Sequence, residues 1–222
     1  MIKNYFKTAI RNFQRHAGYT TINVAGLSCG LVSTIFILLW VSDEISYDSF
    51  HKNKNTLYKV WHNSIYTDGS IKTFPSTPAP LVPAAKEQIP EVEFAARMDW
   101  GSELLFAVDE ISLMQQGVWA DPDIFKMFTF PIVLGSEDKP LPDGNSVAIS
   151  EKMASIYFAN EDPIGKSFQV SDQFDVKVSA VFKDIPANSS MQFNFVLPFE
   201  TYAKDRPWMM ANWEVSSNQA FI

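Results

Sequence analysis

The chain has 222 residues, of which 46% are apolar, so it is long enough to bury the core of one domain or of two small ones. Its formal net charge is −7, but residues 1–42 carry four basic side chains and no acidic one, which leaves 14 basic and 25 acidic residues in the remainder. The acidic bulk argues against nucleic acid as a partner, and the single cysteine, Cys29, excludes an internal disulfide.

A basic amphipathic helix is the first predicted element and lies within residues 1–20. Its cations, Lys3, Lys7, Arg11 and Arg15, recur every four residues, and apolar side chains occupy a different face of the same helix. Basic side chains attract anionic lipid headgroups with about 1 kcal/mol each. We therefore expect this helix to lie at a membrane surface, with membrane lipid as its partner.

A transmembrane helix is predicted over residues 21–42. Residues 17–42 contain no Asp, Glu, Lys or Arg, and the predicted helix rises about 33 Å, enough to cross a hydrocarbon core of about 30 Å. The apolar run is too long for a cleaved signal peptide, and the bulky Trp40 stands near the potential cleavage point. We expect the helix to remain as an anchor, with the basic amino end in the cytoplasm and residues 43–222 outside it.

The pentapeptide GLSCG within this helix matches G-x-S-x-G, the pattern around the nucleophilic serine of many hydrolases. That chemistry needs Ser28 on a strand-to-helix turn, followed along the chain by an acid and a histidine. The histidines after Ser28 are His51 and His62, and both follow too soon to leave room for the α/β framework between nucleophile and histidine. We therefore assign no catalytic residue. Gly26 and Gly30 instead have the spacing that lets two membrane helices approach closely, which predicts packing against another helix.

Turn and cap signals in residues 43–222 predict a globular α+β domain after the anchor. Asp68 and Gly69 suit the turn of a hairpin, and Ser150 suits the N-cap of a helix. Asp121, which precedes a proline, is predicted to cap a short helix that continues to Phe128. The other predicted elements are a helix over 81–89 and strands over 92–98, 104–109 and 111–116.

Two stretches near the carboxyl end alternate between apolar and polar residues. The apolar positions are Val176, Val178, Ala180 and Phe182 in the first stretch, and Met191, Phe193, Phe195, Leu197 and Phe199 in the second. This period of two predicts half-buried strands, each with its apolar positions on one face. The chain then stops without a cap or linker signal, so we expect the domain to be truncated at its carboxyl-terminal end.

The octapeptide NEDPIGKS approaches the phosphate-binding pattern G-x-x-x-x-G-K-[ST], but Asn160 stands where the first glycine belongs. Pro163 removes a backbone N–H, and the carboxylates of Glu161 and Asp162 would repel a phosphate. The stretch is predicted to be a turn between a helix and a strand. Since the sequence also has no Cys/His cluster at metal-ligand spacing, we assign neither a cofactor nor a metal.

Three stretches together resemble FtsX-like ABC transporter permeases that carry a MacB-like periplasmic core domain. They read AIRNFQRHAGYTTINVAGLSCGLVSTIFILLWVSDEISYDSFHKNKNTLYKV, DIFKMFTFPIVLGSEDKPLPDGNSVAISEKMASIYFANEDPIGKSF and VSAVFKDIPANSSMQFNFVLPF. The resemblance covers nearly the whole chain and keeps its order and spacing. It is specific for the family and not for a substrate.

The resemblance implies a permease subunit of the bacterial inner membrane, with an extracytoplasmic domain of two small α+β subdomains over residues 43–222. It implies four partners: a cytoplasmic ABC ATPase on a separate chain, membrane lipid, a second permease copy or half, and a periplasmic partner or cargo. Such permeases relay ATP-driven motion to the periplasmic side for export or lipoprotein extraction, and they are not enzymes. By analogy, the basic helix would couple to the ATPase side, and Gly26 and Gly30 would pack the first span.

Two other interpretations stay open at this point. One is a single-pass sensor or binding domain outside the cytoplasm, because one span and one α+β domain would suffice for that role. The other is a membrane-anchored hydrolase, which would depend on Ser28. Further hydrophobic spans after Ile222 would favour the permease, whereas a stop or a cytoplasmic kinase module would favour the sensor.

Overall fold

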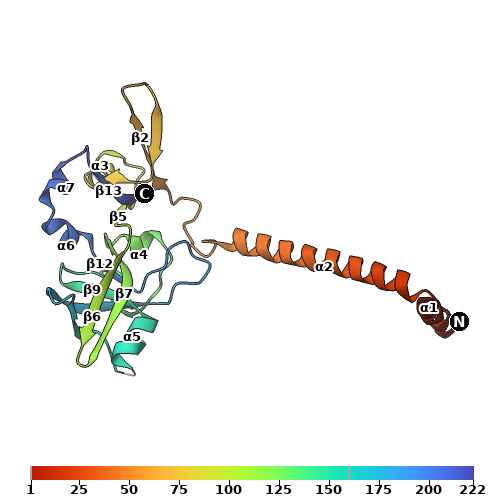
Figure 1. Ribbon diagram of the computed structural model, residues 1–222. Helices are drawn as coiled ribbons and strands as arrows, with labels where there is room; N and C mark the ends of the chain where they lie inside the picture. The colour runs from red at the N-terminus through yellow and green to blue at the C-terminus, as the bar shows by residue number, and fades with distance from the viewer. Residues whose placement is uncertain (1, 160) are drawn as a thin grey trace. The chain divides into compact units, whose positions relative to one another are not determined.

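The computed structural model describes residues 2–159 and 161–222, which form two compact units, Met1–Tyr47 and Asp48–Ile222 (Figure 1). Side chains are described from residue 4 onward, so the side chain of Lys3 lies outside the described residues, as does Asn160. The second unit combines helices and strands, which confirms the α+β class.

The first unit consists of two helices, α1 (Ile2–Arg15) and α2 (Ala17–Ser46). The helical geometry breaks at His16, where φ is −119° and ψ is 45°. α2 begins before and ends after the predicted range 21–42, and its 30 residues rise about 45 Å. Among the described residues it is the one helix long and apolar enough to cross a membrane, and none of its residues is buried.

The second unit is built on an 11-stranded sheet, accompanied by a separate two-stranded hairpin. The sheet comprises β1 (Lys59–Val60), β4 (Thr77–Pro78), β5 (Ala96–Met98), β6 (Ser102–Val108), β7 (Ile111–Ala120), β8 (Ile132–Gly135), β9 (Ser146–Ser150), β10 (Ser167–Val170), β11 (Phe174–Phe182), β12 (Phe195–Pro198) and β13 (Ser216–Phe221). The helices of this unit are α3 (Leu81–Gln88), α4 (Ile124–Met127), α5 (Glu151–Phe158), α6 (Phe199–Lys204) and α7 (Pro207–Ala211).

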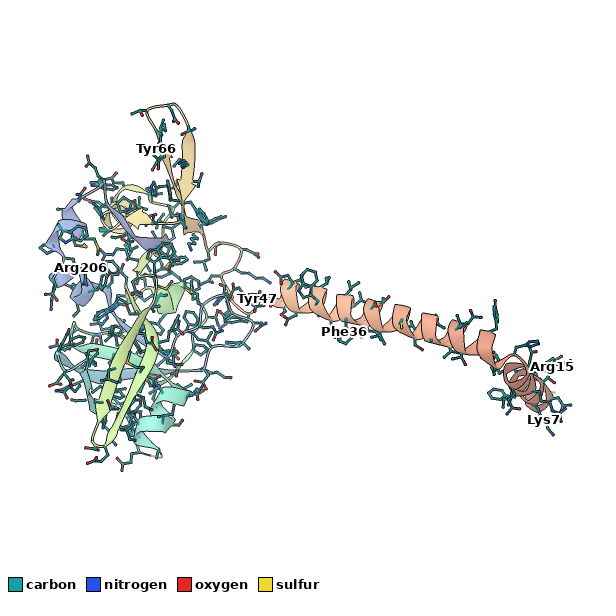
Figure 2. The ribbon with its side chains drawn as sticks, viewed as in Figure 1. Lys7, Arg15, Phe36, Tyr47, Tyr66 and Arg206 are labelled. Carbon is teal, nitrogen blue, oxygen red and sulfur yellow. The ribbon has the colours of Figure 1, made fainter. Side chains whose placement is uncertain are left out.

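The hairpin consists of β2 (His62–Ile65) and β3 (Ile71–Phe74), which pair in antiparallel register. Gly69 has φ +78° in its turn, the left-handed backbone that glycine adopts without strain, so the predicted hairpin is confirmed. The hairpin projects from the rest of the domain, with Tyr66 near its tip (Figure 2).

Six strands of the large sheet close into a ring. They pair in the order β7, β12, β9, β11, β10 and β6, and β6 pairs again with β7. Closure leaves these strands without a free edge for much of their length. One continuous sheet therefore runs through the Asp48–Ile222 unit.

Buried apolar side chains form two large clusters, one on each face of the central strands. The first is rich in aromatic rings: the centroid of Phe106 lies 4.7 Å from that of Phe195 and 5.2 Å from that of Phe168. The second joins Phe128 and Phe182 to the outer side of the same strands. Such burial contributes about 25 cal/mol for each Å² of apolar surface removed from water.

Gly117 on β7 is the point of closest approach within the ring. A Cβ atom at this position would lie 2.4 Å from ring atoms of Phe195 on the neighbouring strand β12. Real Cβ atoms do not come this close to a neighbour, so the phenyl ring lies directly on the backbone of β7. The absence of a side chain at residue 117 thus allows the first cluster to close.

The two alternating stretches do not each present one apolar face, so that part of the prediction was wrong. Val176 and Val178 belong to the first cluster, whereas Ala180 and Phe182 belong to the second. The reason is an irregularity of β11, whose register with β9 shifts between Val178 and Ala180. A shift of one residue moves every following side chain to the opposite face.

The second stretch differs for another reason. β12 is limited to Phe195–Pro198, and all four of its residues are buried. The strand lies between β7 and β9, with a cluster on each of its faces, so it is not half-buried. A central strand covered on both faces has no polar side, which is why alternation misled the prediction.

Of the two predicted helix caps, one is confirmed and one is wrong. The Ser150 hydroxyl accepts a hydrogen bond from the Met153 N–H at 3.1 Å and caps α5. Asp121 does not cap α4: its carboxylate accepts from Nε and Nη2 of Arg97 at 2.8 and 2.9 Å. A bidentate, charge-assisted pair is stronger than a neutral cap bond, and Arg97 on β5 competes for this carboxylate.

The remaining elements agree with the prediction in type and differ in their ends. α3 confirms the helix predicted over 81–89. The strand predicted over 92–98 is shortened to β5, and the one predicted over 111–116 extends to Ala120 as β7.

Candidate functional site

The segment that directly follows α2 is tied to the domain by a dense set of hydrogen bonds. We call residues 48–56 the junction. Asp48 starts it with φ 53°, a left-handed conformation that Asp tolerates better than most residues. Its backbone N–H donates to the Asn188 carbonyl at 2.9 Å. Its carboxylate accepts from the Ser189 hydroxyl at 3.1 Å and from the Ser190 N–H at 2.9 Å.

His51 is the buried centre of the junction, with 5% of its surface exposed. Its Nδ1 accepts a hydrogen bond from the Thr129 N–H at 3.0 Å, so the ring proton lies on Nε2, 3.8 Å from Oδ1 of Asp48. The rings of Phe128 and Phe130 contact the imidazole edge-on, with centroids 5.2 and 5.6 Å away. The imidazole therefore fastens the junction to the second apolar cluster.

Two further residues bind the junction to the end of α4 and to the residues that follow it. The Lys52 N–H donates to the Thr129 hydroxyl at 2.8 Å. The Asn53 amide donates to the carbonyls of Lys126 and Met127, both at 3.1 Å. Acceptors at the end of α4 and just after it thus hold the junction in place, and it is not a free linker.

The titratable groups of the junction differ in what sets their pKa. Burial acts to raise the pKa of Asp48, but the hydrogen bonds from Ser190 and Ser189 and the nearby imidazole outweigh it and lower that pKa. Burial lowers the pKa of His51, and the Asp48 carboxylate opposes this only in part. Near neutral pH the pair therefore consists of a carboxylate beside a neutral imidazole.

A cavity of about 620 Å³ lies next to the junction. It is lined by Asp48, His51, Lys54, Leu57, Lys59, Met98, Asp99, Trp100, Gly101, Gln116, Gly117, Val118, Phe128, Ser190, Met191, Gln192, Phe193, Gln219 and Phe221. The lining comes from the junction, from the start of β1, from β5 and β7, and from β13. Segments far apart in the sequence therefore meet around it.

Asp99 is a buried carboxylate in the wall of this cavity, 4% exposed. Its oxygens accept from the Trp119 N–H at 3.0 Å and from the Ser102 hydroxyl at 2.7 Å. Burial raises the pKa of Asp99, and these hydrogen bonds reduce the increase. The group bridges the turn between β5 and β6 to β7, which is a structural role.

Lys59 supplies a cation at the edge of the same cavity. Its Nζ donates to Oε1 of Gln219 at 2.6 Å and lies 5.5 Å from the ring centroid of Trp100 and 5.9 Å from those of Trp61 and Phe221. Partial burial lowers its pKa. Aromatic faces attract an ammonium group but offer no hydrogen-bond acceptor.

The structure places the sequence-predicted residues outside this region. Gly26, Ser28 and Gly30 lie within α2, so Ser28 is on no strand-to-helix turn. No other atom beyond their own helix surrounds the two glycines within 4 Å among the described residues, and their packing stays a prediction. Of the basic residues, Lys7, Arg11 and Arg15 are exposed on α1.

The phosphate-binding pattern is confirmed as a connecting turn. It lies between α5 and β10, and Lys166 pairs with Glu161 within it. The junction and cavity residues were missed by sequence reasoning. Only Asp99 stood out in the sequence, because it is a charged residue between the apolar Met98 and Trp100 directly after a predicted strand.

Comparison with known proteins assigns the domain. The sequence model of the MacB-like periplasmic core domain matches residues 20–220. No curated protein matches the chain.

Two solved structures share the fold. One is a domain of a protein assigned as a permease from Porphyromonas gingivalis, with 24% identity and a TM-score of 0.65, covering 77% of this chain and 73% of that one. The other is the periplasmic region of MacB from Actinobacillus actinomycetemcomitans, with 15% identity and a TM-score of 0.52, covering 76% and 74%.

Proposed function

Since the chain belongs to the family of the MacB-like periplasmic core domain, we propose that it is a permease subunit of an ABC transporter of the MacB/FtsX type. In this proposal α2 crosses the bacterial inner membrane with α1 on the cytoplasmic side, and the Asp48–Ile222 unit lies in the periplasm. The subunit relays ATP-driven motion from a cytoplasmic ATPase to a periplasmic cargo or partner, for export or lipoprotein extraction.

The junction is the observation that supports a relay. A domain that must follow the movement of a membrane helix needs a stiff connection to it, because a free linker would absorb the displacement. Here residues 48–53 make side-chain or backbone bonds to two separate parts of the domain, the loop at Asn188–Ser190 and the end of α4 with the residues that follow it. Displacement of the segment that follows α2 would therefore be passed to these parts of the domain.

The membrane part of the proposal assigns roles to residues of α1 and α2. Lys3, Lys7, Arg11 and Arg15 bind anionic headgroups or the ATPase side. Gly26 and Gly30 pack against a second permease copy or half, or against another span. Leucine at either glycine should weaken that association in crosslinking of the assembled transporter, and unchanged association would remove the assignment.

The proposal gives this chain no catalytic residue and no cofactor. ATP hydrolysis takes place on a separate ATPase chain, and this subunit converts the resulting motion into work at the periplasmic domain. The partnership is tested first by identifying an ATPase encoded beside this gene and co-purifying the two proteins.

The relay is tested with the assembled transporter in lipid nanodiscs. Ser155 is an exposed residue of α5, so a spin label is attached to the cysteine of the Ser155→Cys variant, made in a Cys29→Ala background. Distances between labels on two subunits are compared without nucleotide and with trapped ATP, and we expect the distribution to shift. A Gly-Gly-Ser insertion between residues 47 and 48 should abolish the shift while ATP hydrolysis continues.

The same insertion after Glu137, in an exposed loop that follows β8, is the matched control and should leave the shift intact. If the insertion before residue 48 also leaves it intact, the junction does not transmit motion. A stop directly after Ile222, or a kinase module in the full reading frame, would instead support the single-pass sensor.

A further inference from the structure

We propose that the cavity beside the junction binds a small monoanionic ligand, a carboxylate carried on an apolar body, and that Lys59 anchors the carboxylate. The inference goes beyond the relay and does not depend on an ATPase. It rests on the charges, the partners and the walls of the cavity.

Lys59 is an exposed cation at the rim of the cavity, and a ligand can replace the solvent around its ammonium group. No carboxylate of the described residues lies within ion-pair distance of its Nζ, since the ion pairs of the domain involve other basic residues. Gln219 accepts one of its three N–H groups. The rings of Trp61, Trp100 and Phe221 stabilise the charge without accepting the other two. An incoming carboxylate oxygen can accept them.

The two carboxylates of the cavity are already occupied. Asp48 accepts from Ser189 and Ser190, and Asp99 accepts from Ser102 and from the backbone of Trp119. Their charge is balanced by the two cations of the lining, Lys54 and Lys59, so they do not make the cavity selective for a cationic ligand. They do oppose a second negative charge, which favours a monoanionic carboxylate over a dianionic phosphate.

The walls fit an apolar body of limited size that carries a polar end. Apolar side chains, among them Leu57, Met98, Val118 and Phe128, share the lining with polar and charged ones. The amide of Gln116 adds a donor and an acceptor that can orient a peptide, whereas the Gln192 amide already donates to the carbonyls of Pro186 and Ser189. A volume of about 620 Å³ lies within the usual range of small-molecule sites, which is about 300 to 1,000 Å³.

The cavity also reaches the junction, because Asp48, His51 and Lys54 line it together with residues of β5, β7 and β13. A ligand here would contact the segment that follows α2 and the sheet at the same time. It would thus be bound at the point where displacement enters the domain.

The test measures calorimetric binding to the full chain in lipid nanodiscs. Two probes carry the carboxylate: the peptide acetyl-Ala-Ala-Phe with a free carboxyl end, and octanoate. The amidated form of the same peptide lacks the charge. We expect at least one carboxylate probe to bind, and to bind at least tenfold more tightly than the amide. Binding of the peptide points to a polypeptide source, and binding of octanoate alone points to a lipid-derived one.

Lys59→Gln removes the charge and keeps most of the side chain, so it should abolish the preference over the amide. Lys72→Gln, on β3 outside the cavity, is the matched control and should keep the preference. Thermal unfolding of both variants checks that the domain remains folded. The proposal is overturned if neither carboxylate probe binds, if the amide binds equally well, or if Lys59→Gln keeps the preference.

Discussion

Replacement of Gly117 by alanine should destabilise the domain by about 2 kcal/mol or more. The added Cβ would lie 2.4 Å from three carbon atoms of the Phe195 ring, well inside van der Waals contact. Neither partner can move easily, because Phe195 is fully buried and Gly117 is paired on both sides, with Ser102 and with Phe195 itself. Overpacking of a closed core costs typically 1 to 3 kcal/mol, so about 2 kcal/mol is the expected value.

A double-mutant cycle isolates this contact. Phe195→Leu alone leaves space in the first cluster and should itself destabilise the domain by about 1 to 2 kcal/mol. In Gly117→Ala/Phe195→Leu the new methyl group enters that space, so the double variant should be at least about 1 kcal/mol more stable than additivity predicts. Urea unfolding of the full chain in detergent, followed by near-ultraviolet circular dichroism, measures each free energy.

Gln116→Ala is the control, since Gln116 is an exposed neighbour on the same strand and its loss should cost less than about 1 kcal/mol. Strict additivity in the cycle, or a Gly117→Ala variant as stable as the control, would refute the reasoning. Either result would mean that the Phe195 ring of β12 does not pack against the backbone of β7 at Gly117.

Three other predictions concern the junction and the topology. Asp48→Ala should lower the unfolding free energy by about 1 to 2 kcal/mol, because it removes two hydrogen-bond acceptors and places alanine at φ 53°, whereas Asp48→Asn should cost less; equal losses in urea unfolding would contradict this. Folding lowers the pKa of His51 below its ordinary value of 6.5, so as the pH falls the imidazole is protonated more readily in the unfolded chain than in the folded one. The free energy of unfolding should therefore decrease as the pH drops below 6.5. His51→Asn should flatten the pH dependence, and a wild-type chain without any slope there would count against a buried neutral imidazole. Finally, a thiol at Ser155 in a Cys29→Ala background should react with an impermeant reagent on spheroplasts, and labelling only after lysis would reverse the proposed orientation.

Local patterns accounted for the elements that depend on neighbouring residues. The apolar run without charges specified α2, the Asp68-Gly69 pair specified the hairpin turn, and Ser150 specified the start of α5. Each signal acts within a few residues, since hydrophobic periodicity, turn backbone and cap bonds are all short-range. The ends of α2 were less well determined, because the last turn of a helix frays or extends according to the contacts of the adjoining segment.

The sequence by itself determined that an uncharged helix precedes an acidic α+β domain, because charge and periodicity are written along the chain. The tertiary structure alone decided the junction and the cavity. Asp48 meets Ser190 across 142 residues, and Lys59 meets Gln219 across 160. Such contacts arise when distant segments pair, as β1 does with β13, and the register shift of β11 likewise sets which residues face each other, so no local pattern encodes them.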